Sequence, residues 1–297
     1  MENVLESIAE GEILLSDGAM GTMLIDYGIE LDQCFEAINL THPDVLENIA
    51  RSYCEAGSDI VQCNTFGASP MKLSMYSLED KYAEINETAV KAARKAVGDK
   101  AVVAASMGPC GRLLKPFGDA DTENVFDSFK KQAEVVINSG VDMILVETMT
   151  DIEEAKIAVK AAKSVSDNIP VGATMTFDST PRGFFTIMGN DIKTAVKELE
   201  NAGADIVGSN CGNGIEVMIN IAREFKKFAT KPIIIQPNAG LPEMVGGKPT
   251  YNESPQFMAE KAKQFLDIGV SIIGGCCGTT PAHIKALRQM INSYKEK

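Results

Sequence analysis

Three cysteines carry the clearest chemical signal in the sequence. Cys211 stands in the segment GSNCG at 208–212, and Cys276 and Cys277 are adjacent in the segment GGCCGT at 274–279. Neighbouring side chains on a regular strand point to opposite faces, so the adjacent pair converges only where the backbone turns, and the flanking glycines permit that turn. Three thiolates with a fourth position left open are a ligand set of catalytic zinc. We therefore predict a Zn2+ site at these three cysteines.

Two other interpretations of these thiols stay open. Cysteine is often buried for packing, so the three could be structural thiols without a metal. The adjacent pair could instead form a vicinal disulfide in a redox protein that binds no zinc. Of the remaining cysteines, Cys54 is expected to pack in a helix and Cys34 lies in a long first loop. Cys63 ends the second expected strand, Cys110 follows the third, and both are further candidate ligands.

The chain has only two histidines, His42 and His283, and both fall near expected helix starts. We therefore expect neither to act as a metal ligand or a general base. An enzyme without a histidine positioned to act as a general base needs another way to activate its nucleophile. Metal coordination is such a way, because a coordinated thiol is held as thiolate at neutral pH.

Short runs rich in Val and Ile recur along the chain, each followed by a helix-like stretch. Nearly continuous apolar character is typical of parallel strands that are buried on both faces. A glycine that ends a helix just before such a strand recurs at Gly57, Gly140, Gly203 and Gly269. The eight strands are expected at residues 13–16, 59–63, 101–106, 142–147, 170–176, 205–209, 232–236 and 270–274.

This repeated unit predicts an α/β protein with the (β/α)8 TIM-barrel fold, as a single domain spanning residues 1–297. An open doubly wound sheet is the competitor, and it should show a GxGxxG phosphate loop, which the segment DGAMGT at 17–22 does not match. Chemistry in a barrel sits where strands end at the C-terminal face. Side chains from alternate strands share an interior layer, so the sixth and eighth strands can bring Cys211 to the adjacent cysteine pair.

Composition narrows the class of protein. Hydrophobic residues make up 45% and charged residues 23% of the 297, as in ordinary globular proteins. A net charge of −13 argues against nucleic acid or an anionic membrane surface as a partner. We find neither an apolar run of about 18 residues that could span a membrane nor the basic start of a signal peptide. Seven cysteines, an odd number, argue against a disulfide framework, so we expect a cytoplasmic protein.

Segments at the expected strand ends resemble the zinc-dependent homocysteine S-methyltransferase family, most closely the homocysteine-binding module of cobalamin-dependent methionine synthase. The resemblance extends over residues 10–295. One departure is Cys63, which precedes Asn64 where most relatives have threonine and places a spare thiol near the pocket. The segments are DGAMGT at 17–22, NTFG at 64–67, GP at 108–109, ET at 147–148, NC at 210–211, PNAG at 237–240 and GCCGT at 275–279.

The resemblance implies that the sulfur of homocysteine is the fourth zinc ligand and that Glu147 receives its amino group. It implies catalytic roles for Glu147 and Asp17, and a place for Asn238 at the fourth zinc position when substrate is absent. A barrel-rim salt bridge for Glu147 and a turn-forming role for Asp17 stay open. The implied substrate contacts are Asp17, Gly18, Ala19, Asn64, Ser106, Glu147, Asn210 and Asn238.

The resemblance also implies the reaction, which is methyl transfer to the thiol of homocysteine to give methionine. We expect the donor to be methylcobalamin on a separate corrinoid protein, supplied in trans. S-methylmethionine or S-adenosylmethionine is the alternative donor. Betaine is disfavoured because aromatic faces often hold such cations, and the chain has no Trp and 6% aromatic residues. A non-catalytic zinc barrel that docks a corrinoid protein is the alternative from another functional class.

Overall fold

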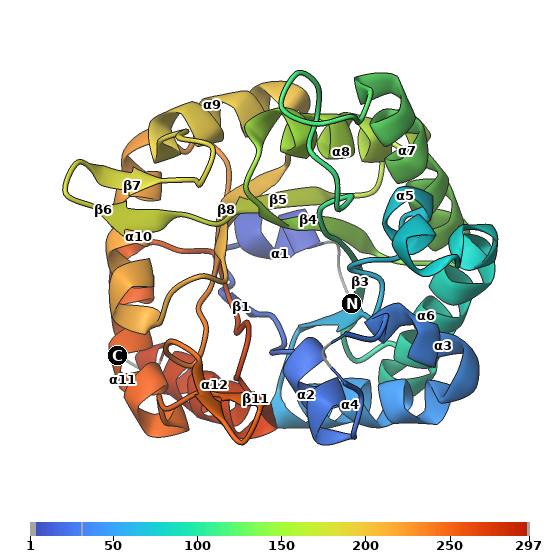
Figure 1. Ribbon diagram of the computed structural model, residues 1–297. Helices are drawn as coiled ribbons and strands as arrows, with labels where there is room; N and C mark the ends of the chain where they lie inside the picture. The colour runs from blue at the N-terminus through green and yellow to red at the C-terminus, as the bar shows by residue number, and fades with distance from the viewer. Residues whose placement is uncertain (1–3, 31, 296–297) are drawn as a thin grey trace.

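Eight parallel strands form a closed ring, seen along its axis in Figure 1. The computed structural model describes residues 4–30 and 32–295, so residues 1–3, 31 and 296–297 of the predicted domain lie outside the described residues. Strand pairing runs in the order β1-β12-β9-β8-β5-β4-β3-β2, and a bridge between Ser16 and Ile60 closes the ring. The strands are β1 (Leu14–Leu15), β2 (Ile60–Cys63), β3 (Val102–Met107), β4 (Met143–Met149), β5 (Val171–Met175), β8 (Ile206–Asn210), β9 (Ile233–Gln236) and β12 (Ile272–Ile273).

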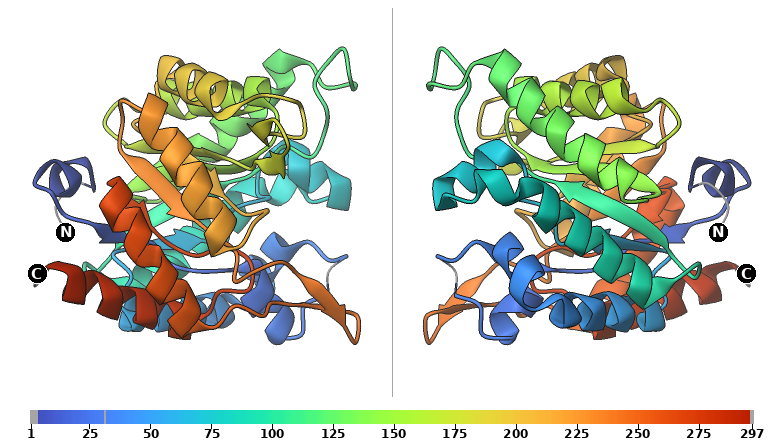
Figure 2. Two further views of the ribbon diagram at one scale, coloured as in Figure 1. Left: turned by 90° about the vertical axis from the view of Figure 1, so that its left-hand side faces the viewer. Right: turned by 90° about the vertical axis from the view of Figure 1, so that its right-hand side faces the viewer.

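Helices alternate with these strands and surround the ring (Figures 1 and 2), which confirms the predicted TIM-barrel class. All eight predicted strands overlap an observed one. Within the described residues, no helix combines the length and the apolar character needed to cross a bilayer. The outer helices are α4 (Pro43–Ala56), α6 (Tyr82–Val97), α7 (Thr122–Asn138), α8 (Ile152–Val165), α9 (Ile192–Ala202), α10 (Ile215–Phe228), α11 (Pro255–Ile268) and α12 (Pro281–Lys295).

Several short elements lie in the connections that follow strands. The long first connection holds the helices α2 (Gly21–Asp26), η1 (Phe35–Ala37) and α3 (Ile38–Thr41). Two antiparallel hairpins were not predicted: one follows β5 and the other follows β9. The elements of the remaining connections are α5 (Pro70–Leu73), η2 (Ser74–Tyr76), η3 (Glu79–Lys81), β6 (Asp178–Thr180), β7 (Gly183–Phe185), β10 (Glu243–Val245) and β11 (Lys248–Thr250).

A helix, α1 (Val4–Ala9), covers the N-terminal end of the barrel. Val4 is buried in one apolar cluster with residues near the start of the strands, such as Leu14, Ile60 and Val102. Figure 2 shows α1 at one end of the molecule and the β10–β11 hairpin at the opposite end. Because α1 closes one end, the C-terminal end is the face that can admit a substrate.

Four joints, in each of which a glycine ends a helix just before a strand, recur around the barrel. Gly57, Gly140, Gly203 and Gly269 all have positive φ angles, as the sequence predicted. In three of the four joints an aspartate follows, and its carboxylate accepts the backbone N–H of the preceding strand and pairs with a basic side chain. These groups are Asp59 with Leu15 and Arg288, Asp142 with Val103 and Arg94, and Asp205 with Val171 and Lys163.

We predict that Asp205→Ala lowers the free energy of unfolding by roughly 1–3 kcal/mol, because it removes the acceptor of two hydrogen bonds. Asp205 Oδ2 lies 2.8 Å from Val171 N and 2.6 Å from Lys163 Nζ. Urea unfolding measures the change, with Glu260→Ala, at an exposed acid on α11, as the control. Equal effects of the two substitutions would show that the joint does not stabilise the barrel.

Candidate active site

The three predicted zinc ligands lie together at the C-terminal mouth of the barrel. The Sγ atoms of Cys211, Cys276 and Cys277 all lie within 4.8 Å of one another, and those of Cys211 and Cys277 are 3.8 Å apart. Tetrahedral coordination with Zn–S bonds of about 2.3 Å separates two sulfurs by about 3.8 Å. The spacing and the soft donor set therefore fit a zinc ion.

The backbone turns at Cys211, so that its side chain lies beside those of Cys276 and Cys277. Strand β8 ends at Asn210, and Cys211 follows with φ 61°, a left-handed conformation that is uncommon for a residue with a side chain. Thr148, which follows Glu147, has a similar φ of 59°. Such strained residues cluster at functional sites, where the surrounding structure holds them in place. Here the backbone N–H of Cys211 donates to Gln236 O at 3.1 Å.

The adjacent cysteines lie in a loop three residues beyond β12, not at the end of the strand as predicted. The loop after β9 holds them: Cys276 N donates to Pro237 O at 2.7 Å, and Ala239 N donates to Cys277 O at 3.0 Å. Gly278 has φ +80°, and a Cβ there would lie 2.1 Å from Cγ of Tyr251. The predicted glycine-permitted turn is therefore present.

The sulfurs affect each other's protonation. Hydrogen bonds with Cys211 and Cys276 lower the pKa of the Cys277 thiol to about 3. Hydrogen bonds with Cys211 and Cys277 raise the pKa of Cys276 well above its ordinary value. The protein alone thus favours one thiolate beside protonated neighbours. A divalent cation among the sulfurs removes this conflict, because it displaces the protons of its thiol ligands.

Two buried carboxyl groups lie inside the barrel near the sulfurs. Asp17 accepts hydrogen bonds from Gln62 N at 2.7 Å and Gln62 Nε2 at 3.2 Å, and Glu147 accepts one from Ser106 Oγ. Burial raises the pKa of each carboxyl to about 7, and the charge of Asp17 adds to the shift at Glu147. A buried pair of acids without a cation is costly when ionised, so the pocket favours a positively charged group.

Asn210 connects the acids to the metal ligands. Its Oδ1 accepts from Thr148 N at 2.8 Å and Thr174 Oγ1 at 2.7 Å. Its Nδ2 lies 3.2 Å from Glu147 Oε2 and 3.7 Å from Cys276 Sγ. The amide thus contacts both halves of the site, and its position depends on three strands.

The other predicted contacts fall into two groups. Gly18 and Ala19 pack on the cysteine loop: Ala19 N donates to Thr279 Oγ1 at 3.2 Å, and a Cβ on Gly18 would lie 2.7 Å from the same oxygen. Asn64 faces the first loop instead, because its Nδ2 donates to Phe35 O and to Asn39 Oδ1, each at 2.8 Å.

Asn238 lies in the loop that holds the cysteines. Its side chain is buried, and among the described residues no group pairs with its Oδ1. Buried polar atoms are normally hydrogen-bonded, so an unpaired oxygen beside a candidate metal site suits a group that binds there.

The spare cysteines lie outside the three-thiol cluster. Cys63 and Cys110 are buried, and burial raises the pKa of each, to about 12 for Cys110. Cys54 packs against the core from α4, as predicted, and Cys34 is buried in the first connection. Of the seven thiols, only that of Cys277, in the cluster, has a lowered pKa.

Sequence reasoning missed two tyrosines. Tyr53 is fully buried, and its hydroxyl donates to Ala19 O at 2.8 Å and lies 3.2 Å from Thr279 O. Tyr251 packs on Gly278, next to Cys277 in the chain, and burial together with the nearby Cys277 raises the pKa of its phenol. Neither position carries a local sequence signal, because each depends on a contact between distant parts of the chain.

Comparison with known proteins decides the family. Residues 14–291 match the family model described as homocysteine S-methyltransferase. The chain belongs to the homocysteine S-methyltransferase family. Methionine synthase of Mycobacterium leprae is 35% identical over 300 residues, and that of Mycobacterium tuberculosis is 34% identical over 308 residues. These matches cover 95% and 98% of this chain but only 24% and 26% of the relatives, so the chain spans about a quarter of their length.

Solved structures support the fold of this homocysteine S-methyltransferase family member. The metallated form of the homocysteine methyltransferase MmuM from Escherichia coli superposes with a TM-score of 0.81. The match covers 97% of this chain and 99% of that one at 22% identity. The apo form of the same protein gives a TM-score of 0.74 over 97% and 100% of the two chains. At this identity the likeness establishes the barrel fold.

We predict that Glu147→Gln stabilises the metal-free protein at pH 8 by roughly 2 kcal/mol and has little effect at pH 5. The raised pKa means that Glu147 contributes stability below its unfolded pKa, and this contribution is lost as pH rises through about 7. Glutamine keeps the shape and carries no charge. Urea unfolding at the two pH values measures the difference, with the exposed Glu123→Gln as the control. A stability gain that is the same at both pH values would contradict the raised pKa.

Proposed function

We propose that this chain transfers a methyl group to the thiol of homocysteine, giving methionine, with Zn2+ held by Cys211, Cys276 and Cys277. The observation that carries the proposal is the spacing of the three sulfurs, all within 4.8 Å of one another at the open end of the barrel. Membership of the homocysteine S-methyltransferase family supports the acceptor. A structural role alone does not account for three thiols gathered beside two buried acids.

The residues of the pocket suit an amino acid with a thiol side chain. When bound, zinc would hold an incoming thiol as a thiolate at neutral pH. Glu147 and Asp17 would receive the ammonium group, which offsets the cost of their ionised forms. Ser106 and Asn210 orient the Glu147 carboxylate through hydrogen bonds. Holding the substrate at both its ammonium group and its sulfur fixes the direction in which the sulfur meets a methyl group.

We further propose that the methyl donor is methylcobalamin carried by a corrinoid protein. Exposed apolar side chains lie on several of the connections that follow strands, with Phe117 75% and Ile187 76% exposed. Such side chains around an opening are typical of a surface that meets another protein, whereas a small free donor needs no such surface. This apolar rim comprises Phe66, Met75, Leu113, Phe117, Ile187, Met188, Leu241, Met244 and Val245.

We predict that replacing Cys211, Cys276 or Cys277 with serine takes the zinc content of the purified protein well below one ion per chain and abolishes methionine formation. Each change removes one of the three protein ligands, and serine is a poor ligand for zinc. Elemental analysis of reduced protein gives the metal content. Cys54→Ser, in α4, is the control and should retain zinc. Full zinc content in any of the three site variants would contradict the assignment.

We predict that the zinc-loaded protein forms methionine from homocysteine and methylcobalamin, and does not do so from S-methylmethionine or S-adenosylmethionine. The double substitution Phe117→Ser and Ile187→Ser should slow transfer from a methylcorrinoid protein and leave transfer from free methylcobalamin unchanged, because only a protein donor contacts the apolar rim. Methionine formation rates with each donor test both statements. Turnover with a sulfonium donor alone would refute the corrinoid assignment, and binding of a corrinoid protein without turnover would favour a docking module.

A further inference from the structure

The proposed reaction assigns no role to His283, yet this residue is only 6% exposed. It is the third residue of α12. Its Nδ1 accepts the backbone N–H of Thr280 at 3.2 Å and lies 3.0 Å from Thr280 Oγ1. The imidazole ring therefore closes the first turn of the helix from the position at which Glu or Gln closes a capping box.

These contacts fix the tautomer of the ring. Because a backbone N–H faces Nδ1, this nitrogen carries no proton in the neutral ring, and the proton is on Nε2. Nε2 lies 3.0 Å from the backbone carbonyl oxygen of Glu253, which can only accept. Burial lowers the pKa of His283 and so favours the neutral ring. His283 therefore donates to Glu253 O, and this bond joins the start of α12 to the segment that precedes α11.

Glu253 connects this histidine to the cysteine pair. The backbone N–H of Glu253 donates to Ala239 O at 3.0 Å, and Ala239 N donates to Cys277 O at 3.0 Å. Ala239 lies in the loop after β9. A row of three hydrogen bonds thus runs from His283 through Glu253 and Ala239 to Cys277. The position of this cysteine therefore depends on a side chain of the helix that follows it.

The side chain of Glu253 reaches the connection that carries the third sulfur. This connection begins with Cys211 and leads into α10, whose first residue, Ile215, donates its backbone N–H to Glu253 Oε2 at 3.3 Å. Two glycines allow the close approach: a Cβ on Gly214 would lie 2.4 Å from Glu253 Oε1, and one on Gly240 would lie 3.1 Å from Glu253 Cγ. Glu253 therefore contacts both the connection after Cys211 and the loop that binds the adjacent cysteines.

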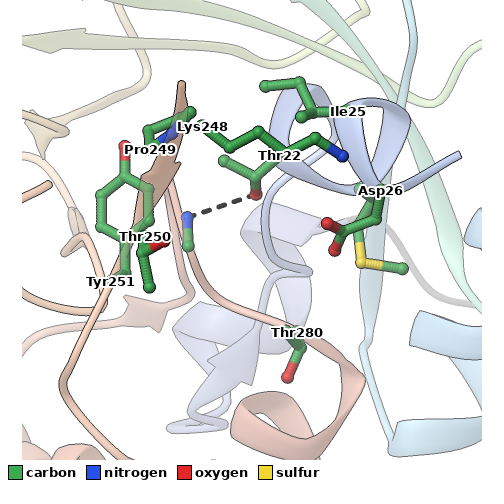
Figure 3. A pocket seen from close by; sticks show the side chains of 10 residues that line it. Thr22, Ile25, Asp26, Lys248, Pro249, Thr250, Tyr251 and Thr280 are labelled. Atoms are coloured by element: carbon green, nitrogen blue, oxygen red, sulfur yellow. Dashed lines mark hydrogen bonds between the residues drawn. The ribbon is translucent and has the colours of Figure 1, made fainter. Parts of the chain in front are cut away.

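Packing is incomplete on one side of the segment that joins the cysteine pair to α12. Gly278 and Thr280 of this segment line a cavity of about 230 Å³ together with Thr22 and Tyr251 (Figure 3). The dashed line in Figure 3 is the hydrogen bond from Gly278 N to Thr22 Oγ1, at 3.3 Å. A segment beside a cavity has fewer atoms in contact with it. Its position therefore depends more on hydrogen bonds, such as those that run through Glu253.

We propose that His283 is a positioning residue for the metal site, and that it acts through Glu253 to hold the cysteine pair beside Cys211. The inference rests on the proposed zinc site. Ligands that are already held in place lose less conformational freedom when the metal binds, so the metal is bound more tightly. Groups that orient metal ligands from outside the coordination sphere typically change metal affinity by about 10- to 100-fold.

His283→Asn and His283→Gln test the inference as a pair. Asn can accept the N–H of Thr280 but is too short to reach Glu253, whereas the longer Gln can donate to Glu253 O. We expect zinc to leave His283→Asn about tenfold faster than the wild type, and to leave His283→Gln at close to the wild-type rate. Transfer of zinc from each loaded protein to a chromophoric chelator measures the rates. His42→Asn is the matched control, because this exposed histidine precedes α4 without a side-chain capping bond, and it should release zinc at the wild-type rate.

A second pair of variants acts on Glu253 and gives an answer even if His283→Asn fails to fold. Glu253→Ala removes the acceptor for Ile215 N, and Glu253→Gln keeps one, so zinc should leave only Glu253→Ala faster than the wild type. The cobalt-substituted proteins give a further readout. The d–d absorption bands should shift in His283→Asn and Glu253→Ala, because the sulfurs are displaced, and should keep their wild-type positions in the two Gln variants.

The outcomes separate positioning from a purely structural role. Wild-type rates of zinc release from His283→Asn and Glu253→Ala would overturn the inference, because the bonds through Glu253 would then not hold the site. Equally fast release from the Asn and Gln variants of His283 would overturn it too, since the loss would follow removal of the ring and not of the bond. A wild-type protein that binds no zinc would overturn the proposed function and this inference together, so the two failures are distinguishable.

Discussion

Three sulfur atoms within 4.8 Å of one another are the constraint on which the rest of the site depends. Without a cation only Cys277 readily loses its proton, and the pKa values of Cys211 and Cys276 are raised because one thiolate makes the next harder to form. A cation reverses this preference. The surrounding structure serves to keep the sulfurs close: a left-handed residue at Cys211, a glycine turn beside Cys277, and a loop whose carbonyl and amide groups bind the cysteine backbone.

The same conflict of charge recurs deeper in the pocket. Asp17 and Glu147 are buried with raised pKa values, as are several of the thiols, so the site gathers acidic groups that resist ionisation. A metal ion at one end and an ammonium group at the other would satisfy both sets. The protein alone is thus destabilised at the two places where the proposed metal ion and ammonium group would stabilise it. Such an exchange of stability for function is common in proteins.

The eight strands, the barrel class and the convergence of Cys211 with the adjacent cysteines could be predicted from sequence. Apolar runs indicate strands that are buried on both faces of a sheet, and the glycines beside Cys276 and Cys277 indicate a turn. The signals for the strands and for the turn are therefore local in the sequence. The hairpins, the turned conformation of Cys211 and the packing of Tyr251 against the cysteine loop could not be predicted. Each depends on contacts between residues that are distant in the sequence, such as the ring of Tyr251 on Gly278, and the neighbouring residues carry no signal for them.

The closed ring has a consequence for how the protein would acquire the zinc ion proposed above. The first strand pairs with the last, and the backbone of Asp17 accepts a hydrogen bond from Gly275, just before the cysteine pair. During synthesis Cys211 emerges long before its partners, and a half-built barrel offers zinc a single thiolate. The proposed zinc site is therefore complete only in the finished ring, so zinc would bind among the last events of maturation.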